Sequence, residues 1–143
     1  MTLNQIIQII QTEAESHKQV NKFAVGAEFD FAVSQVEFYP IVWLMPNGFN
    51  FSTENRVVDY QFSIMVMDRT FEDSSNTIEV LSDTALIVID LITLLKRRNE
   101  NFEVIVANTA EPFYDSGSDV VAGHAIDITI RTAYLESYCD IPT

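Results

Sequence analysis

Residues 56–68 read Arg-Val-Val-Asp-Tyr-Gln-Phe-Ser-Ile-Met-Val-Met-Asp, and apolar and polar side chains alternate clearly along them. Apolar side chains stand at every second position, and they are Val58, Tyr60, Phe62, Ile64 and Val66. Because successive side chains of a β-strand point to opposite faces, this spacing predicts one long strand. The alternate positions are Asp59, Gln61, Ser63, Met65 and Met67. One face of the strand is therefore fully apolar and the other is mixed.

A helix is predicted on each side of this strand in the sequence. The first carries apolar residues at helical spacing, with Thr2 as its cap and an end near His17 to Lys18; these residues are Leu3, Ile6, Ile7, Ile10 and Ala14. The second runs from Asn76 to a basic cluster, Lys96-Arg97-Arg98, which suits the negative end of the helix dipole. Asn76 and Glu79 have the spacing of a capping box.

The second helix is apolar nearly all round between Ala85 and Leu95. A helix of this kind is usually buried on more than one side. One side would meet the sheet, and the other would meet either the first helix or another subunit.

Further strands are predicted at Phe23–Phe31, Tyr39–Leu44, Phe102–Asn108 and Ala122–Tyr134. A turn is expected at Pro46-Asn47-Gly48, followed by a polar loop that ends near Asn55. Thr109–Val121 is expected to be a long connection. The whole pattern predicts one α+β domain over residues 1–143, with a mixed, mainly antiparallel sheet of about four to five strands packed by the two helices.

The two expected loops present aromatic residues at their tips. Phe49 and Phe51 lie in one, and Phe113 and Tyr114 lie beside acids in the other. Aromatic rings are costly to leave in water, so both loops are candidate partner surfaces. The alternative is that these rings fold back onto the core.

The charge is strongly acidic, with 21 Asp and Glu, eight Lys and Arg, and a formal net charge of −13. From Glu100 to Thr143 there are acids at eight positions and one base, Arg131. DNA would repel such a chain at most approaches, and the same charge also serves solubility.

No segment has the ~18 apolar residues that a membrane span needs. A single cysteine, Cys139, excludes an internal disulfide framework.

The residue patterns give no constellation for catalysis or metal binding. The two histidines, His17 and His124, form no zinc-ligand spacing, and a Cys139–His124 nucleophile pair would rest on a residue four positions from the end. Acid pairs occur at Glu28 and Asp30, Glu72 and Asp73, and Asp115 and Asp119, and among 21 acids such proximity is expected by chance. We therefore expect no cofactor, no metal and no enzymatic activity.

The order of these elements resembles that of tailed-bacteriophage neck proteins of the tail terminator or tail-completion group. The stretches that carry the resemblance are Tyr39–Asn47, Tyr60–Arg69 and Ser75–Leu95. The resemblance is one of architecture over most of the chain, because the group has no short signature to match residue by residue. It implies a structural virion protein, made in the host cytoplasm, that forms a ring, typically a hexamer, and contacts other neck and tail proteins.

In such a ring DNA would pass through the lumen without specific binding, and no membrane would be involved. An electronegative lumen would let DNA slide. Asp115, Asp119 and Asp127, in the acidic last third of the chain, are the candidate lumen residues. Two other classes stay open from the sequence: a small acidic protein-binding or assembly-chaperone module that uses the aromatic loops, and a carboxylate-dependent enzyme that uses His124.

Overall fold

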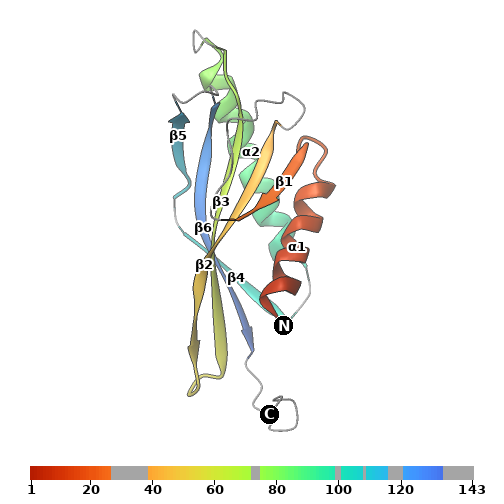
Figure 1. Ribbon diagram of the computed structural model, residues 1–143, viewed down its shortest axis with the longest axis vertical. Coiled ribbons are helices and arrows are strands. Elements are labelled where there is room, and N and C mark those ends of the chain that lie inside the picture. Colours follow the sequence, from red (N-terminus) through yellow and green to blue (C-terminus); the bar gives the residue numbers. More distant parts are fainter. Residues whose placement is uncertain (27–38, 72–74, 99–100, 108, 116–120, 134–143) are drawn as a thin grey trace.

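Figure 1 shows a computed structural model of the chain, which describes residues 1–26, 39–71, 75–98, 101–107, 109–115 and 121–133. Along them the elements are α1 (Leu3–Ser16), β1 (Lys22–Val25), β2 (Ile41–Ser52), β3 (Val57–Arg69), α2 (Thr77–Arg97), β4 (Phe102–Val106), β5 (Glu111–Asp115) and β6 (Val121–Ala133). The predicted α+β class is confirmed. The sheet formed by the described residues has six strands, one more than the upper end of the predicted range.

The strands lie side by side in the order β1-β2-β3-β6-β4, and β5 also pairs with β6. Among the described strands, β1 and β2 run parallel and the other pairs are antiparallel. The longest pairing joins β3 to β6 from Val57 opposite Ala133 to Arg69 opposite Val121. β4 pairs with residues 128–132 and β5 with residues 121–125, so these two short strands share one edge of β6.

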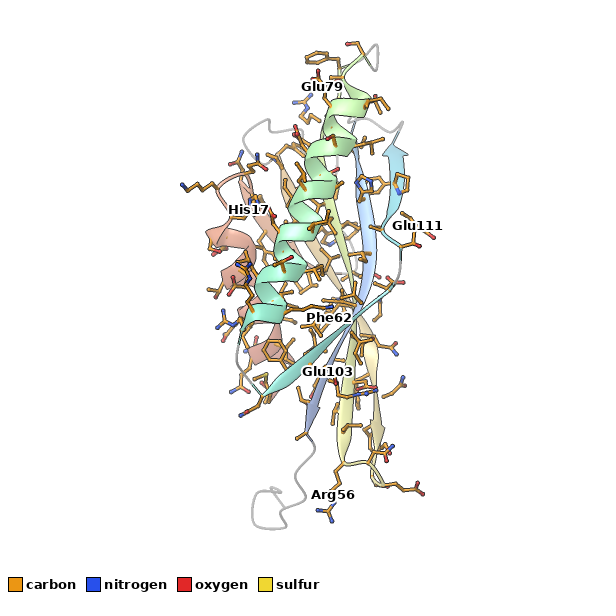
Figure 2. The ribbon with its side chains drawn as sticks, turned by 180° about the vertical axis from the view of Figure 1, so that it is seen from behind. His17, Arg56, Phe62, Glu79, Glu103 and Glu111 are labelled. Carbon is orange, nitrogen blue, oxygen red and sulfur yellow. The ribbon has the colours of Figure 1, made fainter. Side chains whose placement is uncertain are left out.

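Both helices pack on one face of the sheet (Figures 1 and 2). The apolar alternation of residues 56–68 explains this, because Phe62, Ile64 and Val66 point to that face and are fully buried. They pack with the inner side of α2, including Ile87 and Leu91. The other main members of this core are Ile6, Ile10, Ala14, Phe23, Val42, Leu44, Val88, Leu95, Ile126, Ile128 and Ile130.

The two helices begin in different ways. Thr2 and Gln5 form a full capping box at α1: the Gln5 backbone N–H donates to Thr2 Oγ1 at 3.2 Å, and the Thr2 N–H donates to Gln5 Oε1 at 2.8 Å. The predicted box at α2 is wrong, because Asn76 makes no side-chain cap. Its Oδ1 instead accepts from the backbone N–H of Phe71 at 2.6 Å, so the amide links Phe71, just after β3, to the start of α2.

The opposite face of the sheet carries a second, smaller apolar cluster at the end where β6 begins. Its buried members are Tyr39, Ile41, Trp43, Met67 and Val121. The indole Nε1 of Trp43 donates to the carbonyl oxygen of Gly26 at 2.9 Å, which ties the chain after β1 to this face. The mixed character predicted for this side of the central strand is therefore confirmed, since Met67 is buried there while Ser63 and Asp59 are partly exposed.

Two predicted connections turn out to be strand. The turn predicted at Pro46-Asn47-Gly48 is wrong, because β2 continues through these residues to Ser52. The long connection at 109–121 is also wrong, because Glu111–Asp115 forms β5 along the first part of β6. Of the strand predicted at Phe23–Phe31, the structure gives β1 up to Val25, and residues 27–31 lie outside the described part.

Candidate functional site

The far ends of β2 and β3 form a hairpin that carries exposed aromatic side chains. We call residues 49–58 the arm. Phe49 and Phe51 pair with Tyr60 and Val58, so all four side chains point to the same side of the hairpin. The ring centroids of Phe49 and Phe51 are 6.2 Å apart, and those of Phe49 and Tyr60 are 6.0 Å apart. Phe49 and Phe51 are nevertheless 59% and 62% exposed, so most of their surface is in water.

An irregularity in β2 determines to which face of the sheet the rings of Phe49 and Phe51 point. Before it, Trp43 pairs with Met65 and points away from the helices; after it, Phe49 pairs with Tyr60 and points to the helix side. Asn47 and Gly48 oppose one residue of β3, and Gly48 has a φ of 98°, which glycine adopts without strain. Without this extra residue, the phenylalanine rings would lie on the other face of the sheet.

The base of the arm rests against the amino end of α1. The hydroxyl of Tyr60 lies 3.5 Å from the carbonyl oxygen of Met1, and Met1 and Leu3 are each 40% exposed. Phe49 lies directly opposite Tyr60, and Phe51 lies further toward the tip of the hairpin, opposite Val58. The exposure of the two phenylalanine rings shows that neither helix covers them.

α2 carries the second exposed apolar surface. Its inner side is buried through Val80, Thr84, Ile87, Leu91 and Leu95. On the outer side we define an outer stripe of five exposed, uncharged residues: Ile78, Ser82, Leu86, Ile89 and Thr93. Their spacings of four, four, three and four residues put them on one helical face. Ile78, Leu86 and Ile89 are 76%, 55% and 58% exposed, so the described chain leaves this side of the helix uncovered.

The arm and the outer stripe lie at different places on the molecule. In Figure 2, Arg56 marks the tip of the arm at one end of the sheet, and Glu79 marks the first turn of α2 at the other end. Both views show the hairpin extending beyond the two helices. The two surfaces therefore cannot cover one another within a single copy.

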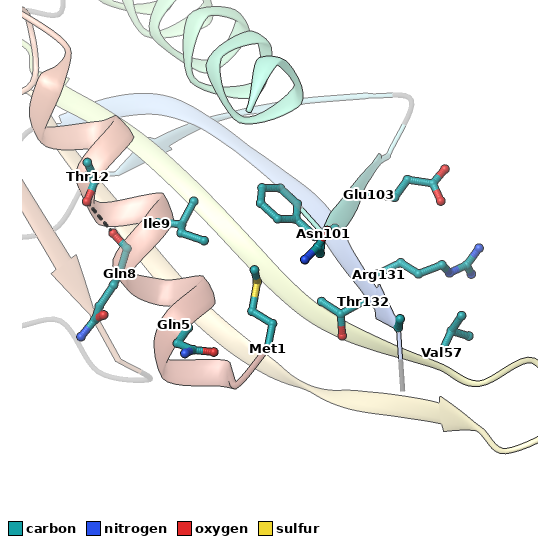
Figure 3. A pocket seen from close by; sticks show the side chains of 12 residues that line it. Met1, Gln5, Gln8, Ile9, Thr12, Val57, Asn101, Glu103, Arg131 and Thr132 are labelled. Atoms are coloured by element: carbon teal, nitrogen blue, oxygen red, sulfur yellow. Dashed lines mark hydrogen bonds between the residues drawn. The ribbon is translucent and has the colours of Figure 1, made fainter. Parts of the chain in front are cut away.

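A hollow of about 1000 Å³ opens between the first turns of α1 and the end of β6 (Figure 3). Gln5, Gln8 and Thr12 of α1 line one side, and Glu103 and Arg131 lie on the other. Arg131 is held by Asp59, with Nε–Oδ1 and Nη2–Oδ2 distances of 2.8 and 3.0 Å. None of the lining residues that the structure describes is a histidine or a cysteine, so the hollow shows amide, hydroxyl and ion-pair groups beside apolar side chains such as Ile9 and Phe102.

His124 lies in β6 and contacts α2. Its Nδ1 is 3.0 Å from Oγ1 of Thr84, and that hydroxyl donates to the carbonyl oxygen of Val80 at 2.9 Å. With its proton used in this way, the Thr84 oxygen accepts from the Nδ1–H of His124. Burial lowers the pKa of His124 below its ordinary value, so the neutral imidazole is favoured. Over the described residues, no three His, Cys, Asp or Glu side chains are grouped so as to hold a metal ion.

The predicted site residues are spread over the sheet. Phe113 lies in β5, half-buried beside the cluster that contains Trp43, which matches the alternative in which the aromatic residues fold back. Asp127 is exposed on the face away from the helices, and its Oδ1 accepts from the Ser63 hydroxyl at 2.6 Å. The side chains of Tyr114 and Asp115, and the whole of Asp119, lie outside the described part.

The outer stripe of α2 was not among the predicted site residues. The signal for it was present, because the helix reads as apolar nearly all round. Periodicity alone does not say which apolar side faces the core, since Leu86 and Ile89 look like Ile87 and Leu91 in a list of residue types. The packing of α2 on β3 and β6 resolves this difference.

No protein-family model matches the chain, and no curated protein is significantly similar to it.

Within the part of the chain that the structure describes, neither helix combines the length and the apolar character needed to cross a membrane.

Proposed function

We propose that the chain is a structural protein of a tailed-bacteriophage virion, which assembles into a ring of about six copies at the head–tail neck and terminates or completes the tail. The observation that carries this proposal is the presence of two separate exposed apolar surfaces on one chain. These are the arm with Phe49 and Phe51, and the outer stripe of α2.

The two surfaces differ in shape, and this difference favours a ring. A symmetric dimer uses the same patch on both partners, and one self-complementary patch is enough for it. A narrow hairpin and the side of a helix are instead suited to a head-to-tail contact, in which each copy offers a different surface to each neighbour. Such contacts close into rings when the rotation between copies allows it.

The resemblance to phage neck proteins supports the same role. The stretches that carry it, Tyr39–Asn47, Tyr60–Arg69 and Ser75–Leu95, fall in β2, β3 and α2. These elements also carry the arm and the outer stripe. The proposed partners are copies of the same chain and the neighbouring neck and tail proteins, and the proposed location is the virion after synthesis in the host cytoplasm.

The acidic charge suits a ring that DNA crosses. With a net charge of −13 per copy, a lumen lined by carboxylates would not hold the phosphate backbone. Asp127 is exposed on the helix-free face, and we propose it as a lumen residue together with Asp115 and Asp119. Replacing Asp127 with lysine is then expected to slow DNA passage in assembled particles, and unchanged passage would argue against this placement.

The experiment that tests the neck role is antibody labelling of particles from a phage whose genome encodes the chain. Label at the head–tail junction, together with rings of about 97 kDa (six copies of the 16.2 kDa chain) by native mass spectrometry, is expected. A chain that is absent from purified virions, or that labels only the capsid, would contradict the proposal.

A protein-binding or chaperone-like module is the second candidate. The observation that favours it is the same pair of exposed rings, Phe49 and Phe51, which would also hold an apolar peptide. A stable monomer that binds a peptide through these rings would support the module. An enzyme, the third class, would instead be stabilised against heat by its substrate or metal, as mass action requires of a specific ligand.

A further inference from the structure

We infer that the arm of one copy packs on the outer stripe of α2 in a second copy of this chain. The inference rests on the proposed ring, and it names the surfaces that join neighbouring subunits. In its simplest form, Phe49 and Phe51 of one subunit contact Ile78, Leu86 and Ile89 of the next.

Both surfaces gain from being covered. Phenylalanine side chains bury about 150–250 Å² each, so two rings that are 59% and 62% exposed leave roughly 200–300 Å² of apolar surface in water. Three large aliphatic side chains on α2 add a comparable area. Monomeric proteins rarely leave contiguous apolar patches larger than a few hundred Å², and rings and aliphatic chains of this kind form the buried centres of interfaces.

Charge identifies a second copy as a suitable occupant. Two copies that each carry −13 repel one another over most of their surfaces. The arm is neutral, since Glu54 and Arg56 are its only charged residues, and the five residues of the outer stripe carry no charge at all. A contact between these two surfaces therefore puts no charged side chain of the stripe itself against the arm, while the exposed carboxylates Glu79, Asp83 and Asp90 flank the stripe.

The surfaces also match in form and polarity. α2 has 21 residues, which gives a side about 31 Å long on which an extended hairpin can lie. The hydroxyl of Thr93 donates to the carbonyl oxygen of Ile89 at 2.7 Å, so this polar group of the stripe is already satisfied within the helix. Lys96 is exposed three residues after Thr93 on the same helical face, so it places a positive charge at the end of the stripe, where the acidic surface of a neighbour is favoured.

The arm and the stripe are different surfaces, so each copy uses both. The contact has one arm and one stripe at every junction, and a chain that has lost either surface ends the assembly on that side. The exposed apolar area at a single junction, roughly 200–300 Å² on each partner, is smaller than the about 800 Å² per partner that standard stable interfaces bury. Ring formation is then expected to depend on protein concentration, because closure needs every junction.

Cross-linking between two variants tests the inference. In a Cys139→Ser background, one chain carries Thr53→Cys at the arm and the other carries Ser82→Cys on the stripe; both positions are exposed, and both changes keep the apolar side chains. After mixing with a short bis-maleimide, we expect the mixed dimer to exceed either homodimer. A chain with both cysteines is expected to give a ladder of oligomers. The matched control replaces Ser82→Cys with Gln8→Cys on α1, which is also exposed.

Loss of the apolar contact is the second measurement. Phe49→Ser together with Phe51→Ser is expected to lower the yield of mixed dimer at least tenfold, since one buried ring contributes more than the 1.4 kcal/mol that corresponds to a factor of ten. Ile105→Ser is the control, because Ile105 is also exposed but lies on β4, outside both surfaces. Circular dichroism confirms that each variant is folded.

The outcomes separate this inference from the proposed neck role. Equal cross-linking to Ser82→Cys and Gln8→Cys, dominant homodimers, or a yield unaffected by the Phe49 and Phe51 changes would overturn the arm–stripe contact. If rings and neck labelling are still seen in that case, the neck role stands and another surface joins the subunits. If the specific cross-link forms but the chain is absent from virions, the contact stands and the neck role is wrong.

Discussion

Arg131 of β6 donates two parallel hydrogen bonds to the carboxylate of Asp59 on the neighbouring strand β3. The Nε–Oδ1 distance is 2.8 Å and the Nη2–Oδ2 distance is 3.0 Å, and the two residues are directly opposite in the register. This pair sits beside the base of the arm, on the face opposite Phe49. It joins β3, which forms one side of the arm, to β6.

The first prediction concerns the ionisation of Asp59. The hydrogen bonds and the charge of Arg131 hold the pKa of this carboxyl below its ordinary value of 3.8. Because the folded pKa is the lower one, the pair stabilises the fold above pH 3.8, and this contribution is lost as the pH falls through the folded pKa. In Arg131→Gln the Asp59 pKa is expected to rise back toward 3.8, as measured by NMR titration. An unchanged pKa in that variant would show that another group perturbs Asp59.

The second prediction concerns His124. Burial against α2 lowers the pKa of its imidazole below the ordinary 6.5, so the unfolded chain binds a proton more readily than the folded one. The neutral ring is therefore favourable at pH 7 and above, and stability is expected to fall as the pH drops below 6.5. Urea denaturation at pH 7.5 and pH 5.5 measures this difference.

His124→Gln is the control for that measurement, since glutamine keeps a donor near Thr84 and does not titrate. It is expected to reduce the loss of stability between the two pH values. An equal loss in the wild type and in His124→Gln would assign the effect to other groups and would contradict the buried placement of this histidine.

Most of the fold follows from the alternation in residues 56–68 and from the two helical periodicities. What the sequence did not predict are features set by neighbouring strands. Pro46-Asn47-Gly48 has the composition of a turn, but some β-bulges also use a glycine with positive φ, and Gly48 has one. Whether Asn47 and Gly48 oppose one or two residues depends on how β3 pairs with β2. The sequence of β2 alone does not contain this information.

The candidate site was predictable in the same partial way. Phe49 and Phe51 were predicted to be loop aromatics that either form a partner surface or fold back onto the core; they are exposed, and they lie on a strand where a loop was predicted. Phe113 has a similar sequence context, but β5 pairs with β6 and turns this ring toward the second cluster. Whether an aromatic residue is covered depends on the strand beside it, which local residue types do not reveal.

The third prediction separates the core from the arm. Phe62 is fully buried between the sheet and the helices, so Phe62→Ala is expected to lower the free energy of unfolding by about 3–5 kcal/mol. Phe51 is 62% exposed, and Phe51→Ala is expected to change the stability of the monomer by no more than about 0.5 kcal/mol. Urea denaturation at a concentration where the chain is monomeric measures both. A large loss in Phe51→Ala would mean that the ring packs within its own chain.

The last prediction concerns the close approach of β6 to β3 at Gly123. A Cβ added at this residue would lie 1.9 Å from the carbonyl oxygen of Val66 and 2.8 Å from the Cα of Met67. Both atoms belong to the backbone, so no side chain can rotate away to make room. Overpacking against side chains costs about 1–3 kcal/mol, and we expect Gly123→Ala to cost about 3 kcal/mol or more, because the two strands themselves must separate.

Gly48→Ala is the matched comparison for that change. A Cβ at Gly48 meets no atom within 4 Å, but the φ of 98° is unfavourable for alanine. Its cost is therefore conformational strain alone, about 1–3 kcal/mol. Thermal and urea denaturation are expected to place Gly123→Ala below Gly48→Ala, and Gly48→Ala below the wild type. If Gly123→Ala is as stable as the wild type, β3 and β6 are further apart at Val66 than the close contact described above.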